Sequence, residues 1–183
     1  MNKQIFWRLI EETNTNTKNQ LVDCNLLIKK LAKLDDEEIF TFYYIFREYH
    51  QLSYKNKLWA AAYVINGGCS DDGFDYFRAW LIGQGEVIFK QTLQDPDSLV
   101  TVCEADFGYE DEDLLGVATE AFFSKYQLEA AYGLFYEKAG QYKLSEQTIN
   151  DLRNEIKFAT DINLDWNEEN LKEVVPNLYA KFC

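Results

Sequence analysis

The side chains best placed to do chemistry lie in the middle of the chain, where three aspartates follow a glycine-rich turn. The segment from Leu58 to Ile82 reads as a helix, a tight turn and a second helix. Seven positions mark the candidate binding site: Trp59, Asn66, Ser70, Asp71, Asp72, Asp75 and Arg78. Asp71 and Asp75 are four residues apart, so a helix places both carboxylates on one face.

Grouped carboxylates support two kinds of chemistry. They bind Mg²⁺ or Ca²⁺, and one of them can act as an acid or base when burial moves its pKa. A structural role competes with both, because aspartates in the first turn of a helix complement its dipole. Asp75 and Arg78 are also spaced as an ordinary i, i+3 ion pair. The pattern favours the structural role, so no catalytic residue, metal ligand or cofactor is assigned. A concave surface beside the turn would favour a ligand site instead.

Two helices are expected to hold this turn. Gly67 and Gly68 can take positive φ and so end the first helix, and Ser70 is placed to cap the second. Aromatic side chains fall on more than one face of both helices, as expected for helices in the centre of a protein. The tyrosines and tryptophans of the segment are therefore assigned to the core rather than to a ligand cage.

The same segment resembles a known family. The run from Leu58 to Leu81, with FWRLI at residues 6–10 and DPDSL at residues 95–99, is similar to a bacterial family catalogued as domain of unknown function 4240. The resemblance covers about residues 1–125 and is strongest from Trp59 to Trp80. It implies a small, mainly helical domain, and it brings neither an activity nor a set of catalytic residues.

The expected fold class is all-α, a compact multi-helix bundle with a helical C-terminal extension. Residues 1–126 are predicted to form the helical core domain, and residues 127–183 the extension packed on it. Besides the central pair, helices are predicted at residues 3–12, 18–33, 35–51, 86–94, 112–126, 128–142, 145–159 and from 167 onwards. Residues 99–104 have β-rich chemistry but no evident partner strand.

Composition restricts the compartment and the kind of partner. The chain has 183 residues and a formal net charge of −13, from 31 acidic and 18 basic residues. Nucleic-acid phosphates and anionic membrane surfaces repel such a chain, so neither is expected as a partner, whereas a basic protein is. No signal peptide and no run long enough to span a bilayer are found, which favours a cytoplasmic location. The four cysteines stand far apart and are expected to be free thiols.

A second candidate site is an acidic loop. Its proposed partner-binding residues are Glu104, Asp106, Tyr109, Glu110, Asp111, Glu112 and Asp113. A solvated surface loop explains the same composition, whereas an aromatic residue among the charges is typical of a protein interface. His50 is the only histidine, and it is assigned to the last turn of a helix rather than to a catalytic role.

Two functions remain open. The favoured one is a cytoplasmic acidic binding protein that is not an enzyme, for instance an immunity protein that neutralises a bacterial toxin by direct contact. The alternative is a small-ligand or divalent-metal-dependent enzyme that uses Asp71, Asp72 and Asp75. The oligomeric state is left open.

Overall fold

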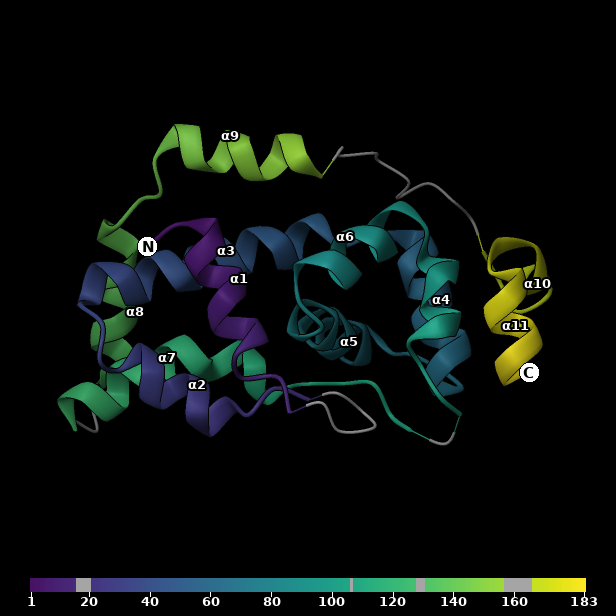
Figure 1. The fold of residues 1–183 in the computed structure, drawn as a ribbon, viewed down its shortest axis with the longest axis horizontal. Helices are drawn as coiled ribbons and strands as arrows, with labels where there is room; N and C mark the ends of the chain where they lie inside the picture. The colour runs from purple at the N-terminus through teal and green to yellow at the C-terminus, as the bar shows by residue number, and fades with distance from the viewer. Residues whose placement is uncertain (16–20, 106, 128–130, 157–165) are drawn as a thin grey trace.

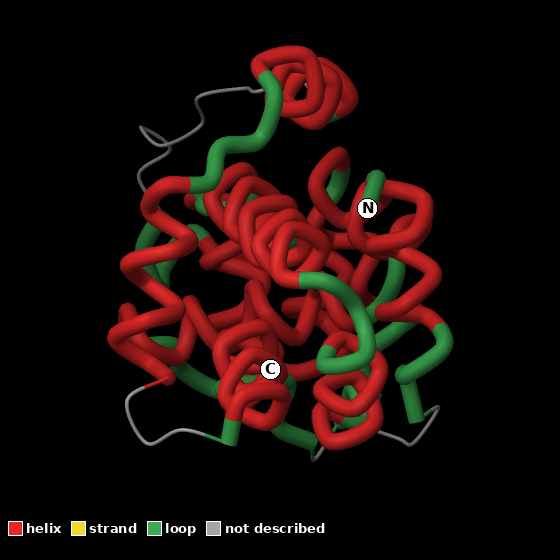
Figure 2. The backbone as a smooth tube through the Cα atoms, turned by 90° about the vertical axis from the view of Figure 1, so that its left-hand side faces the viewer, coloured by secondary structure: helices red, strands yellow, loops and turns green. Residues whose placement is uncertain are grey.

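Helices make up the secondary structure of the described part of the chain. The computed structural model describes residues 1–15, 21–105, 107–127, 131–156 and 166–183. Within these residues β structure is limited to an isolated bridge between Asn14 and Val22, and Figure 2 shows helices joined by loops without a strand. The predicted all-α fold is therefore confirmed. No described helix is both long and apolar enough to cross a membrane.

The described elements are all helices. In chain order they are α1 (Lys3–Glu11), α2 (Cys24–Leu31), α3 (Asp36–Leu52), α4 (Asn56–Asn66), α5 (Asp71–Gly83), α6 (Glu86–Gln94), the 3₁₀ helix η1 (Pro96–Thr101), α7 (Asp113–Tyr126), α8 (Ala131–Gln141), α9 (Glu146–Glu155), α10 (Leu171–Val174) and α11 (Pro176–Phe182). Figure 1 shows α2, α7 and α8 at one end of the molecule, and α4, α10 and α11 at the other.

Helix α3 connects the two ends. It begins at Asp35, whose carboxylate accepts a hydrogen bond from the backbone N–H of Glu38 at 2.8 Å, as the sequence predicts. It contacts α1, α5, α7 and α9, and its aromatic residues form the centre of the core. Trp7 of α1 lies 4.7 Å from Tyr49, ring centre to ring centre, and donates its indole N–H to the Tyr49 hydroxyl at 3.1 Å.

The central helix–turn–helix segment forms as predicted. Gly67 ends α4 in the left-handed region, with φ of 66°, and Ser70 caps α5 by accepting a hydrogen bond from the N–H of Gly73 at 3.1 Å. Trp80 is fully buried. The turn thus aims α5 back through the core, which brings Asp75 and Arg78 beside the C-terminal end of α3.

The C-terminal helices α10 and α11 pack on α4 and η1. The buried Asp97 carboxylate of η1 accepts hydrogen bonds from the backbone N–H groups of Asn177 (3.0 Å) and Leu178 (2.9 Å), and from the Asn177 side chain. Lys181 of α11 donates in return to the carbonyls of Val100 and Cys103. Hydrogen bonds made by side chains of η1 and α11 therefore attach the C-terminal helices to the rest of the domain. The predicted domain boundary near residue 126 stays a prediction.

The structure differs from the sequence-based expectation in three places. Helix α2 starts at Cys24 rather than near residue 18, because Asp23 caps it and Val22 is held in the bridge to Asn14. The β-rich run 99–104 forms no strand. Its first three residues belong to η1 and the others follow it, because Pro96 and the Asp95 cap start a helical turn there. At the C-terminal end, Pro176 begins α11 instead of only interrupting a helix. The first residues of the predicted helix 128–142 and the end of the helix 145–159 lie outside the described residues.

Replacing Asp97 by alanine should loosen the C-terminal helices. The variant removes the acceptor of the Asn177 and Leu178 backbone N–H groups and of the Asn177 side chain, so we expect a loss of about 2 kcal/mol in the free energy of unfolding, measured by urea denaturation. Amide hydrogen exchange should show the loss of protection at residues 176–182 first. Asp97→Asn, which keeps one acceptor oxygen, should cost less. Unchanged protection of α11 in Asp97→Ala would contradict this account of the attachment.

Candidate functional site

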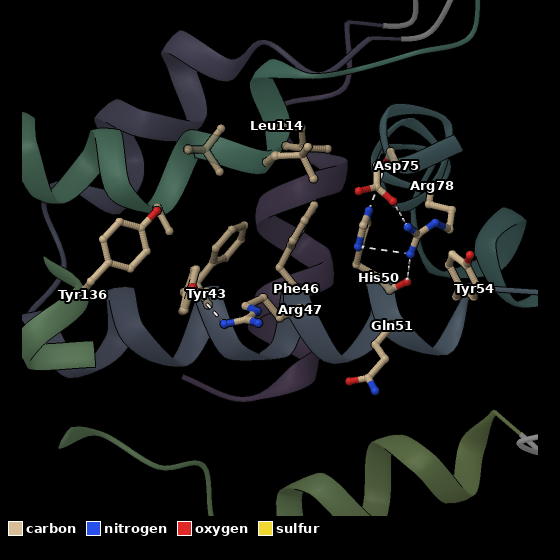
Figure 3. A pocket seen from close by; sticks show the side chains of 14 residues that line it. Tyr43, Phe46, Arg47, His50, Gln51, Tyr54, Asp75, Arg78, Leu114 and Tyr136 are labelled. Atoms are coloured by element: carbon tan, nitrogen blue, oxygen red, sulfur yellow. Dashed lines mark hydrogen bonds and ion pairs between the residues drawn. The ribbon is translucent and has the colours of Figure 1, made fainter. Parts of the chain in front are cut away.

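A cavity of about 750 Å³ opens between α3, α5, α7 and α8. Tyr54, just after α3, also borders it. Its lining residues are Phe42, Tyr43, Phe46, Arg47, His50, Gln51, Tyr54, Asp75, Arg78, Leu114, Leu115, Val117, Ala118 and Tyr136. The α3 residues recur at spacings of three and four, which places them on one face of that helix. Figure 3 shows Asp75, Arg78 and His50 at one end of the cavity and Tyr136 at the other.

The middle of the cavity is apolar. Phe42 and Phe46 of α3 face Leu114, Val117 and Ala118 of α7, and all five side chains are buried in the core. Such a wall offers apolar contact but few groups that could orient a ligand. Orientation must therefore come from the two ends, where polar and aromatic side chains gather.

Arg78 organises the polar end. Its side chain is only 5% exposed. Its Nη1 donates to the backbone carbonyl of His50 at 2.6 Å and contacts His50 Nδ1 at 3.2 Å, and its Nη2 forms an ion pair with the Asp75 carboxylate. The guanidinium also lies over the ring of Tyr54, 4.9 Å from its centre. Burial lowers the pKa of Arg78, and the charge of Asp75 opposes that effect.

These contacts fix the protonation and orientation of His50. A guanidinium can only donate, so His50 Nδ1 must be the acceptor, and Nε2 then donates to the backbone carbonyl of Asp75 at 3.0 Å. The ring also stacks on Phe46. Burial lowers the pKa of His50, and the positive charge of Arg78 lowers it further. His50 is therefore neutral near pH 7, and both of its nitrogens are engaged within the protein.

The structure divides the seven residues of the predicted turn site. Asp75 and Arg78 line the cavity, whereas Ser70 acts as a helix cap and the exposed Asp71 and Asp72 occupy the first turn of α5. Trp59 stacks on Phe74 and donates to the carbonyl of Cys69 at 3.1 Å.

Asn66 has a core role as well. Its side-chain oxygen accepts from the N–H of Tyr109 at 3.2 Å. Among the described residues, no group of three or more His, Cys, Asp and Glu side chains could hold a metal ion. Of the predicted turn site, the cavity thus includes only Asp75 and Arg78.

The acidic loop is likewise divided. Tyr109, predicted as a partner-binding residue, is fully buried, and its hydroxyl donates to the carbonyl of Glu104 at 3.0 Å, so its side chain does not reach the surface that a partner would contact. Asp111 is also buried, and its carboxylate accepts from the N–H of Leu114 at 3.1 Å at the start of α7. The exposed side chains left for a partner are Glu104, Glu110, Glu112 and Asp113. Asp106 lies outside the described residues.

His50 is the cavity residue that the sequence interpretation undervalued. Its place in the last turn of α3 is as predicted, but its partners come from α5, 25 and 28 positions later in the chain. One local pattern could have drawn attention to it, since Phe42, Phe46 and His50 follow one another every fourth residue on one face of a helix.

Fold and cavity define a helical domain with a ligand-sized opening between its central helices. Residues 1–124 match the family described as "Protein of unknown function (DUF4240)". Because this match covers more than half of the 183 residues, the chain belongs to that family, and the resemblance seen in the sequence is confirmed. Comparisons with curated proteins and with solved structures gave no match.

The single histidine allows a direct test of the polar end. In an NMR titration, the only imidazole signal should show the neutral tautomer with its proton on Nε2 and a pKa below 6.5. Arg78→Gln should raise the pKa of His50, because it removes the nearest positive charge, whereas Arg47→Gln should raise it less. A pKa at or above 6.5 in the unmodified protein would contradict the contacts described here.

Burial raises the pKa of Asp111 to about 6. Between about pH 4 and pH 6 the folded chain therefore keeps a proton that the unfolded chain has lost, so folding stability falls as pH rises through this window. Asp111→Asn keeps an oxygen that can cap α7 and buries no charge. We expect it to match the unmodified protein near pH 4 and to be more stable at pH 8, on the order of 1–2 kcal/mol, by urea denaturation. A variant that is less stable at pH 8 would refute this interpretation.

Proposed function

We propose that this protein binds a small molecule in the cavity between α3, α5, α7 and α8. The observation that carries the proposal is an opening of about 750 Å³ with an apolar wall and polar groups gathered at one end. This volume lies within the range of small-molecule sites, and the arrangement of lining residues is the one such sites have. Of the residues named in the alternative hypothesis, Asp75 lines the cavity, and this supports its small-ligand part.

Two further features support a ligand over a void left by imperfect packing. Close-packed interiors leave few spaces larger than a water molecule, yet this cavity adjoins fully buried core residues. The large aromatic side chains Tyr54 and Tyr136 are also 45% and 57% exposed at its two ends. A bound molecule would cover these two tyrosine rings, whose apolar surface is otherwise exposed to water.

A neutral fluorescent dye tests the proposal. N-phenylnaphthylamine should gain fluorescence on binding, and the cavity-filling variant Leu115→Trp should weaken its binding by about tenfold or more, because the larger ring occupies the same space. Leu26→Trp is the matched control, since Leu26 is exposed on α2 and does not line the cavity. Circular dichroism checks that both variants fold. Equal dye binding by both variants would overturn the proposal. Fractions of a cell extract can then be screened for displacement of the bound dye. Mass spectrometry of a fraction that displaces the dye identifies the ligand.

A second candidate is contact with a basic protein, of which neutralisation of a toxin by an immunity protein is one form. The net charge of −13 and the exposed side chains of Glu104, Glu110, Glu112 and Asp113 support this candidate, since complementary charge speeds and selects association. Affinity capture from the native host should then recover a basic protein that Glu110→Lys no longer retains. Glu137→Lys, an equal charge change on the exposed side of α8, is the control. Capture that is insensitive to Glu110→Lys would count against an acidic-loop interface.

A further inference from the structure

We infer that the cavity selects an amphipathic organic anion, such as an aromatic or medium-chain carboxylate, whose charged group lies at Arg47. Figure 3 shows this arginine turned toward Tyr43 and away from the Asp75–Arg78–His50 cluster. The inference rests on the proposed function and names the chemistry of the ligand. The apolar body would lie along the wall formed by α3 and α7.

The net charge of the cavity lining is opposite in sign to the net charge of the whole chain. The whole protein carries −13, yet the charged side chains that line the cavity are Arg47, Arg78 and Asp75. Since His50 is neutral, the lining has a net charge of +1. The acidic surface of the chain as a whole repels an anion, and the positive lining of this opening offsets part of that repulsion.

Arg47 is the cation free to meet that anion. Its exposed guanidinium donates to the hydroxyl of Tyr43 at 3.0 Å, and no carboxylate of the described residues pairs with it. The other arginines are paired, Arg8 with Glu12, Arg78 with Asp75 and Arg153 with Glu48. A planar guanidinium that is not already paired suits a carboxylate in bidentate geometry.

Arg78 belongs to the fixed polar border of the cavity. Its side chain is more than nine-tenths buried in the cavity wall, and its Nε has no hydrogen-bond partner. A buried donor without a partner is costly. Asp75 neutralises the charge of Arg78, so the cluster itself neither strongly attracts nor repels an anion. It supplies a fixed polar border, and the attraction comes from Arg47.

Two dyes with the same ring skeleton separate charge from apolar fit. Anilinonaphthalene sulfonate carries an anionic group that N-phenylnaphthylamine lacks. We expect the sulfonate dye to bind the full chain more tightly than the neutral dye, and added salt to weaken only the sulfonate dye. Arg47→Gln should weaken the sulfonate dye about fivefold and leave the neutral dye unchanged. Arg8→Gln, an equal change at an exposed arginine of α1 away from the cavity, should affect neither.

Each outcome decides between the two proposals. If both dyes bind equally in the unmodified protein and in Arg47→Gln, the ligand is not selected by charge, and the inference fails while the proposed function stands. If Arg47→Gln and Arg8→Gln weaken the sulfonate dye alike, the effect belongs to the overall charge and the inference also fails. If Leu115→Trp weakens the binding of neither dye, the dyes do not bind in the cavity and the proposed function itself fails.

Discussion

A buried guanidinium joins the end of α3 to the middle of α5, and the arrangement around the cavity depends on that contact. Removing Arg78 from water is costly unless its N–H groups find acceptors. The carbonyl of His50 lies in the last turn of α3 and accepts from the Ser53 hydroxyl as well as from Arg78. The Asp75 carboxylate lies one turn earlier on α5. The Arg78 guanidinium thus donates to a carbonyl in the last turn of α3 and forms an ion pair within α5. In doing so it fixes the angle at which the two helices meet.

This contact also explains why a cavity persists in an otherwise dense helical domain. Helix α3 is held at one end by Arg78 and along its length by the aromatic side chains of α1, so it cannot move to close the space. Helix α7 is fixed at its start by the Asp111 cap and by packing on α2. Helices α3 and α7 pack on each other, and the cavity opens where Asp75 and Arg78 of α5 and Tyr136 of α8 complete its border.

The sequence predicts local structure well where one residue type decides the outcome. Ser70, Asp35 and Gly67 cap their helices as expected, because capping depends on neighbours three or four positions away. The site depends on contacts between distant segments, and there the sequence was informative only in part. It grouped Asp75 with Arg78, which are one turn apart, but it could not place His50 beside them. It also named the buried Tyr109 as a partner-binding residue, because charged neighbours in a sequence do not show which way a side chain turns.

The family match ends at residue 124, whereas Tyr136 closes the far end of the cavity from α8. The polar end and the apolar wall are thus built from the shared part of the chain, and the opposite boundary comes from the part that follows it. Under the proposed function, a relative that diverges after α7 would keep the polar end of the cavity while accepting ligands of a different length. Selectivity among such molecules would then change without any alteration of the helical frame.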